Sequence, residues 1–317
     1  MIKVYLSVGL VAFCLSLTLG FVLIPLLKRL RFGQNILSYV KEHAGKSGTP
    51  TFGGLIFLPT AIVTCLPFLE RAGRDFWVAA SIGIAYMFVG LMDDALKKIH
   101  RENKGLTALQ KLFFQTAVAV FAGFYCMKSG ASRMEIPFWG QSVEMGFWTL
   151  PLSVLVFLAT VNAVNLTDGL DGLAAGTSVP FFFTLGCLVL SVSGGALSML
   201  CFALVGGLAA YLLFNNYRAT VFMGDTGSLG LGGFAASIAL VGGKAFYLPI
   251  IGGMFALSVI SVIIQVIYYK ASGGKRIFRM SPIHHHFQQT GYSEGKIAYA
   301  YFMITALMGV LVLLDIL

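Results

Sequence analysis

Long apolar runs recur along the whole chain and are separated by short polar segments. A helix needs about 20 mostly apolar residues, with a range of roughly 17–25, to cross the hydrocarbon core of a bilayer. Ten runs meet or approach that length, so the pattern predicts ten transmembrane helices. They cover residues 4–27, 52–69, 76–92, 108–127, 147–163, 174–193, 196–214, 227–243, 246–268 and 297–316.

Two of these runs allow a second interpretation. The run at 227–243 is short and rich in glycine, but small residues let membrane helices approach closely, which favours a packed helix over a loop. The run at 4–27 could be a signal peptide. It is long enough to span, however, and no A-x-A cleavage site follows it, so we expect it to be retained as the first helix.

The composition supports a membrane protein. The chain is 57% hydrophobic and only 11% charged, whereas soluble domains carry roughly 25% charged residues. This balance excludes a soluble fold, and the apolar runs continue from end to end. The sequence therefore predicts an all-α integral membrane protein in which residues 1–317 form a single polytopic domain.

The basic residues predict an orientation. Sixteen of the 22 Lys and Arg lie in or beside the loops that follow the first, third, fifth, seventh and ninth predicted helices. The positive-inside rule places these loops in the cytoplasm and both termini on the outer face. The net charge of +9 is then explained by an anionic membrane surface, and nucleic-acid binding is not expected. The longest outer loop, 128–146, is expected to hold a small hairpin around 137–140.

The cysteines carry no chemistry in this interpretation. There are five, all within or beside apolar runs and without C-x-x-C spacing: Cys14, Cys65, Cys126, Cys187 and Cys201. We expect neither a disulfide framework nor a zinc site.

Aspartates are the most informative residues, because only 13 acidic residues occur in the chain. Five of them stand at the predicted cytoplasmic ends of helices: Asp93, Asp94, Asp168, Asp171 and Asp225. One such aspartate could simply cap a helix. Five from three separate segments on one predicted side indicate a site, and oxygen ligands shared with phosphates suit magnesium. Asn165 shares the three-residue spacing of Asp168 and Asp171.

A histidine triplet adds a second signal. His284, His285 and His286 are consecutive, so their side chains diverge, which is poor geometry for zinc. We interpret them as hydrogen-bond donors to anionic oxygens beside Arg279 and Lys275; an interfacial loop without chemistry is the alternative. Metal-binding acids with basic groups, and no nucleophile motif, indicate phosphoryl transfer. The membrane setting suggests a lipid phosphate as one substrate.

The motifs resemble a known family over essentially the whole chain. They are GKSGTPTFGGL at 45–55, the Asp93-Asp94 pair, NAVNLTDGLDGLA at 162–174, VFMGDTGSLGLGG at 221–233 and MSPIHHHF at 280–287. Together they resemble the polyprenyl-phosphate N-acetylhexosamine-1-phosphate transferases, and the triple histidine resembles their phospho-N-acetylmuramoyl-pentapeptide transferase branch. One departure is Gln288, where that branch is expected to have an acidic residue.

The resemblance implies an activity. It implies ten helices in the bacterial cytoplasmic membrane, a cytoplasmic active site, a Mg²⁺ cofactor and homodimers. The substrates would be UDP-N-acetylmuramoyl-pentapeptide and undecaprenyl phosphate, and the products lipid I and UMP, in peptidoglycan synthesis. A sibling enzyme that uses UDP-N-acetylglucosamine is an alternative. A ten-span transporter is another, although its acids should lie near the bilayer midplane.

The resemblance also implies residue roles. Asp225 is similar to the main magnesium ligand, and Asp93 and Asp94 to the pair near the reacting phosphates, so these three are the expected catalytic residues. Nucleotide and pyrophosphate contacts are implied for Asn165, Asp168 and Asp171. The implied uridine contacts are Lys46, Asn215 and Phe222, with Lys111 as a further basic residue and His284, His285 and His286 on the substrate face. Direct attack by the lipid phosphate is the expected mechanism, and an aspartyl-phosphate intermediate is the rival.

Overall fold

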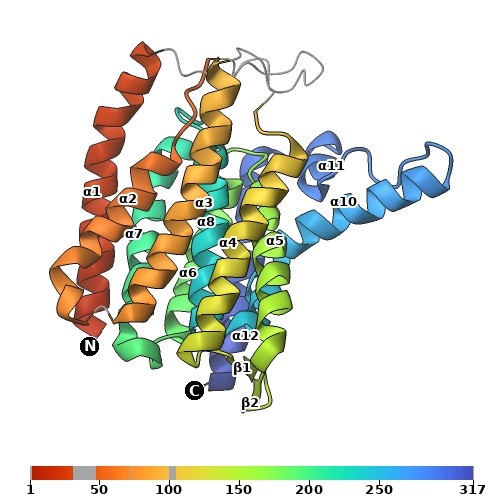
Figure 1. The fold of residues 1–317 in the computed structure, drawn as a ribbon. Coiled ribbons are helices and arrows are strands. Elements are labelled where there is room, and N and C mark those ends of the chain that lie inside the picture. Colours follow the sequence, from red (N-terminus) through yellow and green to blue (C-terminus); the bar gives the residue numbers. More distant parts are fainter. Residues whose placement is uncertain (1, 31–47, 72, 100–104, 317) are drawn as a thin grey trace.

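The long helices of the computed structural model lie side by side in one bundle (Figure 1). The structure describes residues 2–30, 48–71, 73–99 and 105–316. Its helices are α1 (Ile2–Arg29), α2 (Gly54–Cys65), α3 (Arg74–Ile99), α4 (Ala108–Ser129), α5 (Thr149–Thr167), α6 (Leu173–Leu188), α7 (Ala196–Asn215), α8 (Gly224–Val241), α9 (Leu248–Ile251), α10 (Gly253–Ala271), α11 (Ile283–Gln289) and α12 (Glu294–Ile316).

Every predicted helix coincides with helical structure, with two instructive differences. α3 continues to Ile99, past the predicted end at residue 92, so Asp93 and Asp94 lie in its last turns and not in a loop. The predicted helix 246–268 is broken into a short 3₁₀ turn, α9 and α10. The break falls at Gly252-Gly253, where two residues of poor helix propensity follow each other. Beyond it α10 leans away from the bundle (Figure 1).

Seven helices within the described residues are long and apolar enough to cross a membrane. They belong to α1, α3, α4, α5, α7, α10 and α12, and α2 and α6 are shorter apolar helices. An integral membrane protein is thereby confirmed. The total of ten crossings stays a prediction, because α8 is not among these seven helices and α2 and α6 are shorter.

The glycine-rich helix α8 lies at the centre of the bundle. All of its side chains from Thr226 to Val241 are buried, and it packs against α2, α3 and α5. The contacts are too close for larger residues: a Cβ on Gly232 would lie 2.5 Å from Val161 Cα, and one on Gly90 would overlap the Asp225 carbonyl. The interpretation of this run as a packed helix is confirmed, and the packing brings Asp225 against the end of α3.

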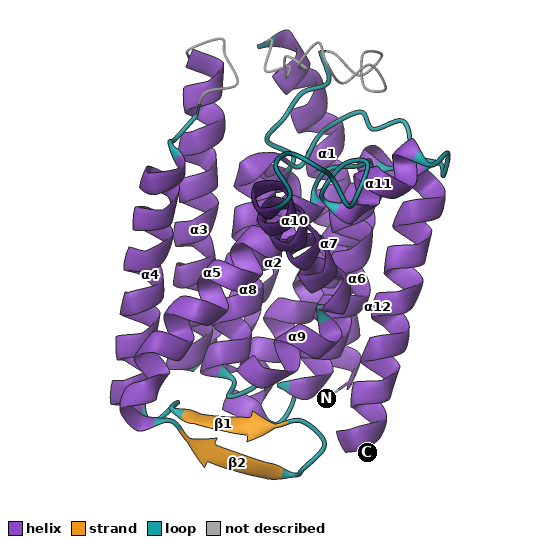
Figure 2. Cartoon of the chain, turned by 90° about the vertical axis from the view of Figure 1, so that its right-hand side faces the viewer, coloured by secondary structure: helices purple, strands orange, loops and turns teal. Residues whose placement is uncertain are grey.

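The two ends of the bundle differ. At one end, β1 (Arg133–Ile136) and β2 (Gln141–Glu144) form an antiparallel hairpin in which Ile136 pairs with Gln141, as the sequence predicts. The hairpin lies at the same end as both termini, and α11 lies at the other end (Figure 2). The histidines of α11 and the aspartates at the end of α3 and the start of α8 therefore share the end opposite the termini.

Candidate active site

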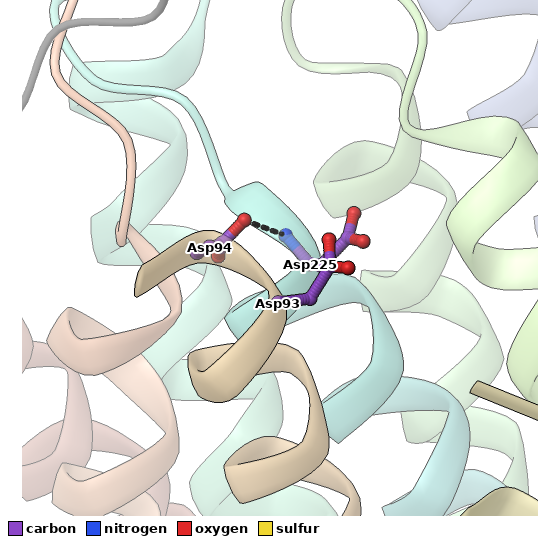
Figure 3. Close-up of side chains that lie close together, drawn as sticks. All are labelled: Asp93, Asp94 and Asp225. Atoms are coloured by element: carbon purple, nitrogen blue, oxygen red, sulfur yellow. Dashed lines mark hydrogen bonds between the residues drawn. The ribbon is translucent and has the colours of Figure 1, made fainter. Parts of the chain in front are cut away.

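Three of the five predicted aspartates meet where α3 ends and α8 begins (Figure 3). Asp93, Asp94 and Asp225 each offer a carboxylate oxygen, and these oxygens lie within 4.8 Å of one another. Asp93 and Asp94 are buried, and the side chain of Asp225 is 15% exposed. Three acids this close repel one another strongly unless cations lie among them.

Two lysine ammonium groups supply that compensation. Lys97 Nζ lies 2.6 Å from Asp93 Oδ2 and 3.2 Å from Asp225 Oδ2. Lys111 Nζ lies 2.6 Å from Asp225 Oδ2 and 3.0 Å from Asp93 Oδ2, as expected for a basic residue of the site. Lys97 was not predicted from the sequence as a site residue, because it stands among the basic residues beside the loop after α3. Its signal was the four-residue spacing from Asp93, which places both side chains on one face once α3 is extended.

Asp94 has a different role from Asp93. Its Oδ1 accepts the Asp225 main-chain N–H at 3.1 Å, and its Oδ2 accepts the Thr226 N–H and hydroxyl at 2.8 and 2.7 Å. A carboxylate that caps the first N–H groups of a helix satisfies donors that lack intrahelical partners and offsets their positive dipole. Asp94 therefore fixes the start of α8, and with it the position of Asp225.

Asn165, near the end of α5, reaches the same cluster. Its Nδ2 donates to Asp225 Oδ1 at 3.0 Å and to Ser228 Oγ at 2.8 Å. Asp225 Oδ1 is thus oriented by the neutral amide of Asn165, while Asp225 Oδ2 contacts the two lysines. The predicted association of Asn165 with the aspartates is present, through Asp225.

The loop between α5 and α6 carries the other two aspartates. Asp168 is half-buried, and burial, together with the negative charges of Asp225, Asp94 and Asp171, raises its pKa to about 8. A carboxyl group of this kind is ready to bind a cation or hold a proton near neutral pH. Asp171 is buried and accepts the Ala219 N–H at 3.0 Å, so it holds the loop after α7.

Asn215 also ties loops together. Its Oδ1 accepts the Gly172 N–H at 3.1 Å, and its Nδ2 donates to the Val221 carbonyl at 2.9 Å. The side chain is buried. Because both ends of the amide are in use, Asn215 positions the loops around the site, and the uridine contact implied by resemblance stays a prediction.

Phe222 is half-buried in the loop before α8. Its N–H donates to the Pro50 carbonyl at 2.8 Å, and its carbonyl accepts the Gly53 N–H at 2.9 Å. The motif that carries Lys46 is therefore bonded to the motif that carries Asp225. Lys46 itself lies outside the described residues, and its predicted contact with uridine is untested.

The side chains of the three histidines lie in different environments. His284 is fully buried, its ring nitrogens have no hydrogen bond, and its pKa is lowered to about 3 by burial and by the neighbouring His285. Its Nε2 lies beside Gly169 in the aspartate loop, and the contact with substrate implied by the resemblance stays a prediction. His286 Nδ1 accepts the Arg279 N–H at 3.2 Å. His285 is half-buried, and its Nδ1 lies 3.2 Å from Gln288 Oε1.

The carboxylate cluster has the chemistry of a divalent cation site. Its donors are hard oxygens, and the described part of the chain brings no histidine or cysteine into this group. Two ammonium groups already neutralise these oxygens, which shows that the cluster attracts positive charge. Asp225 and Asp93 fit such an ion; both oxygens of Asp94 are committed to α8.

The chain is similar to known transferases over nearly its full length. Residues 76–243, which hold the carboxylate cluster, match glycosyl transferase family 4. The phospho-N-acetylmuramoyl-pentapeptide-transferase of Clostridium perfringens (strain SM101) is 41% identical over 296 residues, 93% of this chain and 91% of that protein. The transferase of the same name from Clostridium novyi is 42% identical over 94% of this chain and 93% of that protein.

A bacterium of another genus has a transferase with the same degree of similarity. The phospho-N-acetylmuramoyl-pentapeptide-transferase of Desulforudis audaxviator is 41% identical over 98% of this chain and 97% of its own length. Similarity at this level over nearly the full length of both proteins extends beyond the motifs to the helices between them. The chain belongs to the phospho-N-acetylmuramoyl-pentapeptide transferases of glycosyl transferase family 4.

Proposed function

We propose that this protein transfers phospho-N-acetylmuramoyl-pentapeptide from its UDP-linked precursor to undecaprenyl phosphate, giving lipid I and UMP in peptidoglycan synthesis. The observation that carries the proposal is the full-length similarity to transferases of that name. The site supports it, because the described residues gather three carboxylates and two ammonium groups at one end of a membrane bundle. Phosphoryl transfer depends on this kind of electrostatic arrangement.

Magnesium is the cation proposed for this site, held by Asp225 with Asp93 beside it. When bound, it would neutralise pyrophosphate oxygens and strengthen UMP as a leaving group. The chain's own residues complete the arrangement. Lys97 and Lys111, which contact the same carboxylates, are close enough to bind phosphate oxygens once a cation takes their place.

The reaction itself needs one bond made and one broken. An oxygen of the lipid phosphate attacks the β-phosphorus of the UDP-sugar, and the bond from that phosphorus to the bridging oxygen of UMP breaks. Asp93 would take any proton that remains on the lipid phosphate. Because a lipid phosphate is already anionic near pH 7, no covalent enzyme intermediate is required. Detection of a phosphorylated aspartate after incubation with the UDP-sugar alone would contradict this direct attack.

The orientation proposed from the loop charges has structural support. Both termini lie at one end of the bundle (Figure 1), as an even number of crossings requires. The lysine-bearing ends of α3 and α10 lie at the other end, together with the carboxylate cluster. We propose ten crossings of the bacterial cytoplasmic membrane with this second end in the cytoplasm. Homodimers, implied by the resemblance, are a further prediction.

A substrate assay decides between the proposed function and a sibling transferase. The purified protein in detergent, with undecaprenyl phosphate and Mg²⁺, is given either UDP-N-acetylmuramoyl-pentapeptide or UDP-N-acetylglucosamine, and released UMP is measured. We expect UMP only from the first. Release from the second would indicate the sibling activity. A transporter would release none from either, and the carboxylates at helix ends already disfavour that function.

A further inference from the structure

Asp93 is bonded to the start of α4 through both of its carboxylate oxygens. Its Oδ1 accepts the main-chain N–H of Leu106 at 2.7 Å, in the segment that leads into α4. Its Oδ2 lies 3.0 Å from Nζ of Lys111, which α4 carries, and 2.6 Å from Nζ of Lys97. One oxygen is therefore held by a main-chain donor, and the other contacts ammonium groups at the ends of flexible side chains.

Gly105 leaves the space that this carboxylate occupies. A Cβ placed on Gly105 would lie 2.3 Å from Asp93 Oδ1 and 2.7 Å from Asp93 Cγ. The φ angle of Gly105 lies outside the left-handed region, so its backbone conformation does not require glycine. The carboxylate requires it, because a side chain at this position would displace either Asp93 or the segment that holds it.

A capping box fixes the geometry of this segment. The Thr107 hydroxyl accepts the Gln110 N–H at 3.2 Å, and the Gln110 Oε1 accepts the Thr107 N–H at 2.9 Å. These two bonds hold the chain at the point where it enters the helix. The Leu106 N–H comes directly before them, so the start of α4 presents this N–H and Lys111 to Asp93 as one unit.

We propose that Gly105 and Leu106 are positioning residues for the transfer reaction, in which the Leu106 N–H holds Oδ1 of Asp93 so that Oδ2 is the oxygen presented to the cation and the lipid phosphate. The inference rests on the proposed transferase function. The lysines at Oδ2 can give way to another positive group, whereas the main-chain bond at Oδ1 stays in place. The carboxylate is thus oriented before the substrates bind, which is the positioning on which phosphoryl transfer depends.

The contact itself is measured without substrate or cation. Hydrogen exchange of the Leu106 amide is followed by mass spectrometry on the full-length protein in detergent with EDTA. Exchange should be roughly tenfold faster in Asp93→Leu than in the parent, because the N–H loses its acceptor. Asp75→Leu, at the opposite end of α3, should leave this exchange unchanged. Equal exchange in the parent and in Asp93→Leu would overturn the inference.

Turnover is then compared in two variants that disturb the contact differently. Gly105→Ala places a methyl group against Oδ1 of Asp93. A backbone ester, made by replacing Leu106 with its α-hydroxy acid, removes the N–H without adding bulk. Each should lower kcat by roughly tenfold to a hundredfold, the effect of losing a hydrogen bond to a charged group. The KM for the UDP-sugar should stay close to that of the parent, because the loop between α5 and α6 is not altered.

Matched controls separate positioning from folding. Gly176→Ala makes the same substitution in α6, where a Cβ would meet no atom of the described residues beyond its own helix within 4 Å. An ester at Met145 removes the N–H that donates to the Ser132 carbonyl, in the loop at the opposite end of the bundle. Both controls should keep the parent kcat.

The outcomes distinguish the inference from the proposed function. A parent-like kcat in folded Gly105→Ala and in the Leu106 ester would overturn the inference, as would an equal loss of kcat in the two controls. A raised KM with an unchanged kcat would also contradict it. A parent that releases no UMP would refute the proposed function instead, and the exchange measurement would still test the bond between Leu106 and Asp93.

Discussion

At the scale of single residues, the site combines negative carboxylates with positive ammonium groups. Three carboxylates face two ammonium groups around one small volume at the end of α3. Each oxygen of Asp225 has its own kind of partner, lysines on one and Asn165 on the other. An incoming cation could replace the lysines at these oxygens, and an incoming phosphate could bind the lysines that are released.

Asp225 is the residue expected to matter most for turnover. Asp225→Asn keeps the size of the side chain and removes the charge that holds both lysines, so kcat should fall by about 10²–10³-fold. UMP release under saturating substrates measures this. Asp315→Asn is the matched control, because Asp315 bonds the Phe138 N–H at the opposite end of the bundle. Equal activity of the Asp225 variant and the parent would contradict the assignment.

Replacing Lys97 should change both the stability of the protein and its response to Mg²⁺. Lys97→Met removes one of two cations from buried carboxylates, so in EDTA it should destabilise the protein by roughly 1–3 kcal/mol. The same change removes a competitor for those carboxylates, so added Mg²⁺ should raise the melting temperature of the variant more than that of the parent. Thermal unfolding in detergent with and without Mg²⁺ gives both values. Lys128→Met, an exposed cation at the hairpin end of α4, should respond like the parent.

At the scale of elements, loops are held in place by a few buried polar side chains. Asn215 joins the loop before α6 to the loop before α8, and Asp94 holds the start of α8. Gln265 on α10 does the same for the segment that leads to α11, since its Oε1 accepts the Ile277 and Phe278 N–H groups. These bonds couple segments that are far apart in the chain.

Replacing Asn215 should loosen substrate binding more than chemistry. Asn215→Leu leaves the Gly172 N–H unpaired, at a cost of about 1–3 kcal/mol, and leaves the Val221 carbonyl with only the longer bond from the Tyr211 hydroxyl at 3.4 Å. We expect a KM for the UDP-sugar raised about tenfold or more, with a smaller change in kcat. The control is Asn216→Leu, an exposed neighbour whose side-chain oxygen accepts the Tyr217 N–H. A normal KM in the Asn215 variant would show that the loops hold without it.

A separate group of polar side chains holds the hairpin against the bundle. This group predicts that the stability of the protein depends on pH. Lys244 and the Tyr247 hydroxyl both bond the Glu135 carboxylate, and these partners hold the pKa of Glu135 below its usual value despite partial burial. A lowered folded-state pKa adds stability above the ordinary value of 4.5, and this stability is lost as the pH falls through the folded-state pKa.

Melting temperatures between pH 7 and 3 measure this contribution. Glu135→Gln should lower the melting temperature at pH 7 and reduce the loss seen on acidification. Glu144→Gln, on the neighbouring strand and outside this network, should keep the acid-induced loss. If both variants lost the pH dependence to the same extent, the network would not be its source.

At the scale of the whole molecule, the bundle has two chemically different ends. The site end carries the carboxylate cluster and the histidine helix, and the other carries the hairpin and both termini. This polarity matters because a water-soluble nucleotide sugar and a membrane-bound lipid phosphate must meet at one surface. The buried helix α8 spans the distance between the ends.

The polarity predicts opposite accessibility for two positions. In a background with all five cysteines replaced, Gln141→Cys on the hairpin and Lys275→Cys after α10 are both exposed sites. A membrane-impermeant maleimide added to intact cells should label the first and not the second, and permeabilised cells should show both. Labelling of both in intact cells, or of Lys275→Cys alone, would refute the proposed orientation.

Much of the architecture could be predicted from the sequence because it depends on local pattern. Apolar runs of spanning length predicted where the helices lie, although the run at 246–268 is broken into α9 and α10, and turn residues around 137–140 predicted the hairpin. The grouping of Asp93, Asp94 and Asp225 also followed, since acids at one end of neighbouring helices have few other places to lie. The extension of α3 did not follow, because hydropathy ends at Asp93 although the helix continues.

What only the tertiary structure decided is how each polar side chain is used. The sequence by itself determined that the protein lies in a membrane, because the apolar runs require it. It also determined where most helices lie and which ionisable groups are available, because these follow from the spacing and type of the residues. It could not tell that Asp94 caps α8 while Asp93 contacts lysines, or that His284 is enclosed and His285 bonds Gln288. Those differences arise from hydrogen bonds between helices distant in sequence, whose geometry depends on packing within a few tenths of an ångström.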